Sequence, residues 1–370
     1  MTGGVDRAHD VHMARSIGID IGATWTSGVL LGEWGDVLRR TTPVHTPELD
    51  SADLIRLLLE IVDELQVDAR VSAVGVACAG RIRYPQGRIE QAVNHSHGHF
   101  ELRRRLRSRL AGVRVVVDND GNAAAWAEYR MDARIRRGRG VLVLAVGTGL
   151  GSGLVANGVI FRGQDGMGME LGHVVSNPAG RRCGCGIVGC LETEVSGRAL
   201  TRAGLARMEQ ELDGELARFA AEPGREDTFV SDAALVGVPA ALELIAEAGT
   251  RLGAFVAGQL NAYAVDQIVV SGGLTAAVGD LLLNPMRTEC RRLLPVDGHP
   301  RMPVIRRSAL GDDGAMIGAG LLALEHGRTG RGYRRPSVTA VWRWGAGRAA
   351  LLGLSTRTTV TRRSDSQHSN

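Results

Sequence analysis

The sequence of 370 residues contains no lysine, so Arg and His are its only basic side chains. Without lysine the chain can form neither a Walker A phosphate loop nor a Schiff base, because both need that amine. It has no apolar run long enough to cross a bilayer and no apolar stretch after a basic start, which argues against a membrane anchor or a secretory signal. We therefore expect a cytoplasmic protein.

The net charge of +4 is distributed unevenly along the chain. From Arg328 to Asn370 nine Arg stand against one Asp, a net charge of +8, which leaves about −4 for residues 1–327. The basic character therefore belongs to the tail 327–370, whose composition is typical of a solvated, disordered extension. The body is mildly acidic, so its charge gives no reason to expect a nucleic-acid partner.

Cysteine is scarce, and its distribution is informative. Three of the five cysteines, Cys183, Cys185 and Cys190, lie within eight residues. An odd count, clustered in a chain without a secretory signal, favours metal binding over disulfides. The alternative is that these thiols are small buried hydrophobic groups.

Apolar periodicity predicts strands that alternate with helices, which indicates an α/β protein. Residues 1–15 are expected to be a leader. We expect buried strands at 16–21, 26–31, 37–42, 71–77, 113–117, 140–146, 267–270 and 304–306. We expect helices at 52–65, 100–110, 123–131, 199–221, 239–263, 274–294 and 313–325.

One internal similarity connects two distant segments. The pattern of strand, glycine turn and strand at residues 21–29 is repeated at residues 146–154. Backbone N–H groups at such turns can bind phosphate oxygens without lysine. The alternative is two ordinary tight turns, where glycine only supplies permissive backbone angles. The predicted phosphate turns are Gly22, Ala23 and Thr24 in the first segment and Gly147, Thr148 and Gly149 in the second.

Several motifs in one order resemble the ROK family (repressors, open reading frames and kinases) over roughly residues 16–326. They are Asp20–Thr24, Asp118–Ala124, Gly147–Gly153, Glu170–His173, Cys183–Glu192, Ser271–Gly273 and Gly311–Ala315. The resemblance implies a two-lobed, actin-like ATPase (ribonuclease H-like) fold that binds ATP and sugar between its lobes. It implies an N-terminal lobe at 16–119, a larger lobe at 120–311 with a zinc loop at 173–192, and a helix at 312–326 that returns to the first lobe.

The resemblance also implies roles for three polar residues. Asp120 would be the general base that accepts the proton of the sugar hydroxyl. Asn119 would hydrogen-bond the sugar, and Asp20 would contact Mg²⁺ directly or through water. The alternative for Asp118 and Asp120 is helix N-capping, and for Asp20 it is an ordinary turn carboxylate.

The remaining site residues are implied by the same resemblance. His173 would join the three clustered cysteines in a tetrahedral structural zinc site that positions the sugar ligands. The sugar side would comprise Gly80, Arg81, Asn94, Asn119, Glu170, His173 and Glu192. The adenosine side would comprise Ser271, Gly272 and Gly273, together with the segment Gly311–Ala315.

Departures from the family pattern leave the substrate open. Arg81 is similar to the residue of N-acetylmannosamine kinases rather than to that of glucokinases. His95, His97 and His99 replace the usual segment after Asn94; they are interpreted as loop or pocket residues, with a second metal site as the alternative. The 6-hydroxyl of glucose or a related hexose is the first expectation. An amino sugar (N-acetylmannosamine, kanosamine) or a C7-cyclitol of secondary metabolism is the alternative.

Two other classes compete with a kinase. ROK transcriptional regulators carry a winged helix-turn-helix before the kinase-like body, and because Asp20 comes so early in the sequence we expect none here. A sugar-binding pseudokinase would be expected to have lost Asp120 or the glycine turns. We expect a small-molecule sugar substrate and no membrane or nucleic-acid partner, and the family resemblance implies a homodimer or homotetramer.

Overall fold

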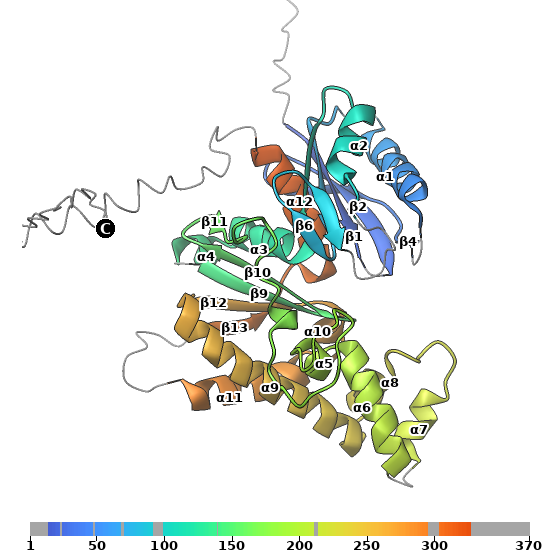
Figure 1. The fold of residues 1–370 in the computed structure, drawn as a ribbon, viewed down its shortest axis with the longest axis vertical. Helices are drawn as coiled ribbons and strands as arrows, with labels where there is room; N and C mark the ends of the chain where they lie inside the picture. Colours follow the sequence, from blue (N-terminus) through green and yellow to red (C-terminus); the bar gives the residue numbers. More distant parts are fainter. Residues whose placement is uncertain are drawn as a thin grey trace, which may run out of the picture. The chain divides into compact units, whose positions relative to one another are not determined.

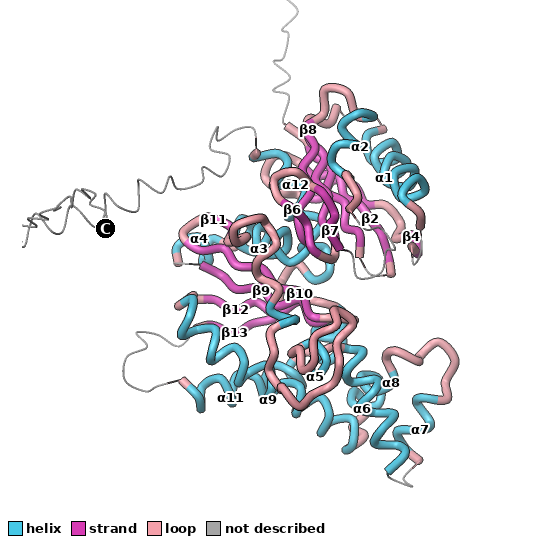
Figure 2. Tube along the Cα trace, viewed as in Figure 1, coloured by secondary structure: helices cyan, strands magenta, loops and turns pink. Residues whose placement is uncertain are grey.

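The computed structural model describes residues 14–22, 24–46, 49–67, 70–91, 99–138, 140–210, 214–294 and 303–326. Two mixed sheets form its framework (Figures 1 and 2). A two-stranded hairpin, β6 (Arg81–Arg83) with β7 (Arg88–Gln91), stands apart from them.

The first sheet has the order β3-β2-β1-β5-β8. Its strands are β1 (Ser16–Ile21), β2 (Trp25–Leu31), β3 (Val37–Arg40), β5 (Ala73–Cys78) and β8 (Arg114–Asn119), with β4 (Val44–His45) paired to β2. β1, β2 and β3 are antiparallel, whereas β1, β5 and β8 are parallel. The central strands are buried on both faces, which explains why they read as continuous apolar runs.

Helices cover both faces of this sheet (Figure 1). α1 (Ser51–Gln66) and α2 (Leu102–Arg109) share the buried apolar cluster of β1, β5 and β8. α12 (Gly314–Glu325) lies against the other face, where Gly18 and Gly75 meet its backbone. A Cβ at Gly75 would lie 1.8 Å from the carbonyl oxygen of Ala319, so only glycine permits this approach. We call this sheet with its helices the first lobe.

The second sheet repeats the plan of the first. Its order is β11-β10-β9-β12-β13, with an antiparallel trio followed by two parallel strands. The strands are β9 (Gly140–Val146), β10 (Leu150–Ala156), β11 (Val159–Ile160), β12 (Gln267–Ser271) and β13 (Val304–Arg307). The expected similarity of residues 21–29 and 146–154 thus corresponds to equivalent hairpins, β1-β2 and β9-β10.

The second sheet is covered on one face by α9 (Pro239–Tyr263) and α11 (Asp280–Leu293), which share its largest apolar cluster. The shorter elements near them are η1 (Leu171–His173), α5 (Glu192–Val195), α6 (Gly197–Gln210), α7 (Glu215–Ala220), α8 (Phe229–Leu235), α10 (Gly273–Val278) and η2 (Gly311–Asp313). We call this sheet with its helices the second lobe. Within the described ranges no single helix has the length and hydropathy of a membrane span, and only α8 and α9 together, bent by 109°, meet that test.

Two helices cross between the sheets. α3 (Asp120–Met131), which is followed by the short α4 (Ala133–Arg137), leaves β8 of the first sheet and packs on β9 and β10 of the second. α12 leaves β13 of the second sheet and packs on the first. The crossing helices also touch each other so closely that a Cβ at Gly318 would lie 1.8 Å from the carbonyl oxygen of Ala123.

The expected elements recur with adjusted bounds, and two expected helices are wrong in extent. The helix expected at 199–221 is divided into α6 and α7. The helix expected at 274–294 is divided at Gly279, whose φ of 50° ends α10 and starts α11. α3 begins at Asp120 rather than at Ala123, because the Asn119 side chain caps it.

Candidate functional site

A cleft of about 1010 Å³ is lined by residues of both lobes. It brings together residues from segments as distant as Asp20 and Met316. The expected site residues that line it are Asp20, Gly22, Thr24, Gly80, Arg81, Asn119, Asp120, Gly147, Thr148, Gly149, Glu170, His173, Glu192, Ser271, Gly272 and Gly273. Ala23 and Asn94, together with His95 and His97, lie outside the described residues.

Asp120 is the first residue of α3, at the point where the chain leaves the first sheet. Its Oδ1 accepts a hydrogen bond from the N–H of Gly121 at 2.8 Å. Burial raises the pKa of Asp120, and hydrogen bonds to the backbone and to Asn119 partly oppose that rise. A half-buried carboxylate with a raised pKa is a better proton acceptor than an exposed one.

Asn119 is the residue that caps α3. Its Oδ1 accepts from the N–H of Asn122 at 3.1 Å, and its Nδ2 donates to the carbonyl of Gly80 at 3.0 Å. The second N–H of the amide acts on the neighbouring carboxylate, since a hydrogen bond from Asn119 lowers the pKa of Asp120. Asn119 therefore combines the capping role, which sequence analysis had considered for the neighbouring aspartates, with a position on the cleft wall.

Asp20 lies at the end of β1 and faces the same part of the cleft. Its Oδ1 is buried and has no hydrogen-bond partner among the described residues. Burial, and then the charges of Asp120 and Asp312, raise the pKa of Asp20 to about 8. Carboxylates that lie close together without a cation repel one another, and a buried, orphaned carboxylate oxygen such as that of Asp20 fits a divalent cation.

Glu170 precedes η1 and lies in the cleft near Arg81. Burial raises the pKa of Glu170 to about 7, with Asp120 and Glu192 adding to the rise and Arg81 opposing it. A cluster of acidic groups at one end of a cleft offers several acceptors to a ligand that is rich in hydroxyl groups.

Glu192 starts α5 and reaches back to the second glycine turn. Its Oε2 accepts a hydrogen bond from the N–H of Leu150 at 3.0 Å. A Cβ on Gly149 would lie 2.6 Å from that same oxygen, so glycine is needed for the contact. The turn itself is closed by the N–H of Gly147, which donates to the carbonyl of Gly149 at 3.0 Å.

The side chains of His173, Cys183, Cys185 and Cys190 converge. Their candidate ligand atoms all lie within 4.8 Å of one another. The Sγ atoms of Cys185 and Cys190 are 3.6 Å apart, and so are the Sγ of Cys183 and the Nδ1 of His173. Zinc–sulfur bonds of about 2.3 Å in a tetrahedron place the sulfurs about 3.8 Å apart, so the cluster has the dimensions of a structural zinc site.

The expected adenosine side follows β12. Gly272 has a φ of 91°, and a Cβ there would lie 2.5 Å from the carbonyl oxygen of Val146. Gly311, in the segment that also lines this end of the cleft, has a φ of 58°. Both glycines occupy backbone conformations that other residues rarely adopt.

Sequence reasoning missed several contacts, some in the cleft wall and some between the lobes. Arg162 forms a buried ion pair with Asp118, with its Nη2 2.6 Å from Oδ2, and so joins the second lobe to the last strand of the first. Asp312 was part of a recognised motif, but its charge was not connected with Asp20. Glu128 and Ser308 also line the cleft and are described below. Of the residues in these contacts, only Asp20, Asp118 and Asp312 lie in motifs that the sequence analysis had recognised.

These features define an α/β protein whose two sheets, of one topology, enclose a cleft with glycine turns and carboxylates. A sequence model of the ROK family matches residues 16–326, and the chain belongs to this family. The glucokinase of Streptomyces coelicolor is 34% identical over 319 residues, which cover 85% of this chain and 98% of that protein.

A second curated relative and one solved structure bear on the substrate. The N-acetylmannosamine kinase of Salmonella newport is 34% identical over 192 residues, which cover 51% of this chain and 63% of that protein. A ROK glucokinase from Streptomyces griseus, solved in complex with glucose and AMPPNP, superposes with a TM-score of 0.75. That structure is 31% identical, and the match covers 84% of this chain and 99% of the other.

Proposed function

We propose that this ROK-family sugar kinase transfers the γ-phosphoryl group of ATP to the 6-hydroxyl of glucose or of a related hexose. The observation that carries the proposal is that Asp120 lines one cleft together with residues of both glycine turns and with Asp20, on whose carboxyl its charge acts. Membership in the family and the similarity to glucokinases along nearly their whole length support it.

In the proposed mechanism, Asp120 accepts the proton of the attacking hydroxyl. The hydroxyl oxygen forms a bond to the γ-phosphorus while the bond from that phosphorus to the β-bridging oxygen breaks, which releases ADP. The side-chain amide of Asn119, together with Glu170 and Glu192, would hold the sugar hydroxyl groups. Backbone N–H groups of the two glycine turns would hold the phosphate oxygens in a chain that has no lysine.

Asp20 would hold Mg²⁺, because its orphaned oxygen and the nearby charges of Asp120 and Asp312 need a positive partner. When the cation is bound, it neutralises phosphate charge. We propose a separate structural role for zinc at His173 and the three cysteines. Glu192 is the first residue of α5 and comes shortly after Cys190 in the sequence, so the zinc site would position its carboxylate.

A second acceptor class, the amino sugars, remains a specific alternative. Arg81 lines the cleft and contributes a positive charge near Glu170. The partial match to an N-acetylmannosamine kinase is consistent with such a substrate. A C7-cyclitol also carries several ring hydroxyl groups, from which the acidic groups would accept hydrogen bonds.

The proposal is tested by a coupled ADP-release assay with Mg·ATP. The panel of acceptors comprises glucose, mannose, N-acetylmannosamine, glucosamine, kanosamine and a C7-cyclitol. We expect saturable turnover with glucose that is lost in Asp120→Asn. Turnover restricted to an amino sugar or to the cyclitol would replace glucose by that acceptor, and no turnover with any of them would contradict the hexose kinase assignment.

A further inference from the structure

The cleft-facing side of α3 carries two carboxylates. Asp120, Ala124 and Glu128 lie at intervals of four residues, and all three line the cleft. Residues spaced in this way share one face of a helix. α3 therefore presents the proposed base at its first residue and a second, deeply buried carboxylate two turns later; the side chain of Glu128 is 4% exposed.

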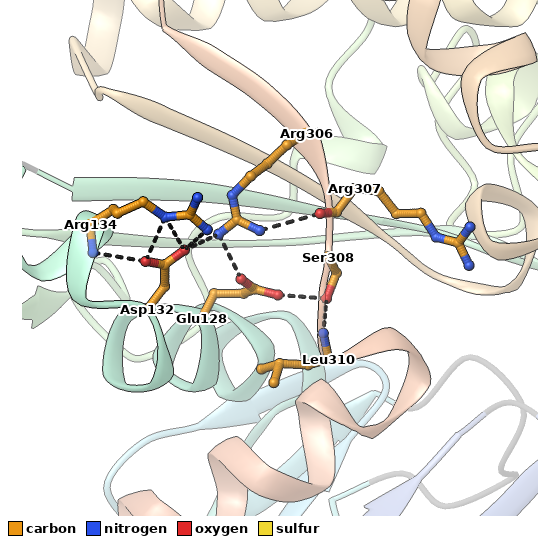
Figure 3. Close-up of polar contacts among 7 residues, drawn as sticks. All are labelled: Glu128, Asp132, Arg134, Arg306, Arg307, Ser308 and Leu310. Atoms are coloured by element: carbon orange, nitrogen blue, oxygen red, sulfur yellow. Dashed lines mark hydrogen bonds and ion pairs between the residues drawn. The ribbon is translucent and has the colours of Figure 1, made fainter.

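Glu128 is held by β13 of the second sheet and by the loop that follows this strand (Figure 3). Its Oε1 accepts a hydrogen bond from the hydroxyl of Ser308 at 2.5 Å. Its Oε2 accepts from Nη2 of Arg306 at 3.1 Å, and the same nitrogen donates to Asp132 at 3.1 Å. Both oxygens of Glu128 are thus bound to the segment that contains Arg306 and Ser308, whereas Asp132 is mainly paired with the exposed Arg134.

Ser308 is the point where the chain leaves the second lobe. Its N–H donates to the carbonyl of Val270 at 2.8 Å, which continues the pairing of β13 with β12. Its hydroxyl oxygen accepts from the N–H of Leu310 at 3.0 Å, which begins the turn toward α12. The hydroxyl of Ser308 therefore lies between the Glu128 carboxylate and the backbone of the crossing segment (Figure 3).

The turn that follows carries Asp312 and Asp313. The charge of Asp312 acts on Asp20 in the proposed cation site. Asp313 forms an ion pair with Arg40 of the first lobe. The turn is thus fixed to the first lobe at Asp313 and, through Ser308, to the helix that bears Asp120.

We propose that Glu128 is a positioning residue for phosphoryl transfer. Glu128 binds Ser308 and Arg306 and thereby fixes the segment that leads from β13 to α12 relative to α3. When the lobes close, the side of the cleft that holds ATP then comes to a fixed place relative to Asp120. The inference rests on the proposed kinase function. A misplacement of reacting groups by about 1 Å can lower a rate about 100-fold while ground-state binding persists.

The test compares the steady-state kinetics of Glu128→Ala, Glu128→Gln, Ser308→Ala and the control Asp132→Asn. The control changes the C-cap residue of the same helix, whose carboxylate pairs with the same arginine, but it leaves the contact of Glu128 with Ser308. Each variant is assayed with Mg·ATP and the acceptor that the wild-type enzyme turns over. The melting temperature and circular dichroism of each are measured in parallel, and rates are taken per folded protein.

We expect Glu128→Ala to lower kcat by about 10-fold or more, with the KM for both substrates changed by less than about 3-fold. Gln keeps an oxygen that accepts from Ser308, so Glu128→Gln should recover part of the rate. Ser308→Ala should lower kcat as well, and combining it with Glu128→Ala should add little, because both act through one contact. Asp132→Asn should keep the wild-type kcat.

Unchanged kcat in Glu128→Ala and Ser308→Ala, with only a lower melting temperature, would overturn the inference and leave Glu128 a purely structural residue. An equal loss in Asp132→Asn would also overturn it. An inactive wild-type enzyme would instead contradict the proposed function. If Glu128→Ala does not fold, Glu128→Gln and Ser308→Ala decide the question by the same criteria.

Discussion

Glu192 accepts a hydrogen bond from the backbone N–H of Leu150 at 3.0 Å, across 42 residues of sequence. The contact ties the segment after the cysteine cluster to the second glycine turn, because Leu150 follows Gly149 directly. Cys183 adds a contact of 3.7 Å from its Sγ to the other oxygen of the same carboxylate. One side chain thus connects the proposed zinc site, the sugar side and the phosphate side of the cleft.

Asp120→Asn should abolish turnover while leaving sugar binding intact. An amide cannot accept the hydroxyl proton, and loss of a general base typically costs about 1,000-fold in kcat. Turnover is measured by ADP release and binding by isothermal titration calorimetry. Asp280→Asn, which changes an exposed aspartate on α11, serves as the control. Retention of more than a few per cent of turnover would refute the assigned role of Asp120.

Purified protein should contain one zinc per chain, and Cys185→Ser should lose it. A structural zinc site no longer holds the metal when one of its four ligands, here a thiolate, is removed, and the surrounding loop is then no longer held in place. Metal content is measured by mass spectrometry, and stability by thermal unfolding with and without a chelator. Cys290→Ala, a buried cysteine of α11 outside the cluster, should keep its zinc. Equal zinc in both variants would contradict the site.

The stability gap between the wild type and Asp132→Asn should depend on pH. Arg134, followed by weaker contacts that include Arg306, lowers the pKa of Asp132 to about 2, from 3.8. A carboxyl group with a depressed pKa in the folded state stabilises the fold above the unfolded pKa and loses that effect as the pH falls through the folded one. The gap in urea midpoint should therefore be full above about pH 4 and should close toward pH 2. A gap that stays constant across this range would contradict the pairing.

Asp118→Asn should destabilise the fold strongly. The carboxylate is buried, pairs with Arg162, and accepts hydrogen bonds from the N–H of Asn119 and from Nδ2 of Asn122. Removing one partner of a buried ion pair typically costs about 3–5 kcal/mol, because the other charge is left without compensation. Urea unfolding measures the loss. The double variant Asp118→Asn/Arg162→Met should recover part of it, and a double variant as unstable as the sum of both single variants would argue against a direct pairing.

Gly318→Ala should destabilise the contact between the crossing helices. A Cβ there would lie 1.8 Å from the carbonyl oxygen of Ala123, so that α12 must move away from α3. Overpacking of this kind typically costs about 1–3 kcal/mol. Gly258→Ala on α9 is the matched control, because a Cβ there meets nothing within 4 Å and alanine is the better helix former. Equal stability of the two variants by thermal unfolding would contradict the tight crossing.

Local signals in the sequence were sufficient for most elements of the fold. β1, β9 and α9 have the expected bounds, because the sequence marks them directly: β1 and β9 are apolar runs that end before a glycine, and α9 begins at Pro239. The breaks between α6 and α7 and at Gly279 were missed, because apolar periodicity continues through them. Gly214 and Gly279 were the available signals, since glycine weakens a helix.

The sequence by itself determined the family and the repeated hairpin, and it indicated many of the residues that line the cleft, because motifs and alternating apolar positions are local properties of the chain. Only the tertiary structure decided which distant side chains meet. Glu128 and Ser308 are 180 residues apart, and Asp118 and Arg162 are 44 apart. Their contacts depend on how α3 and α12 cross between the sheets, and no local pattern encodes that crossing. The orphaned oxygen of Asp20 follows from the same cause, since burial is a property of the assembled fold.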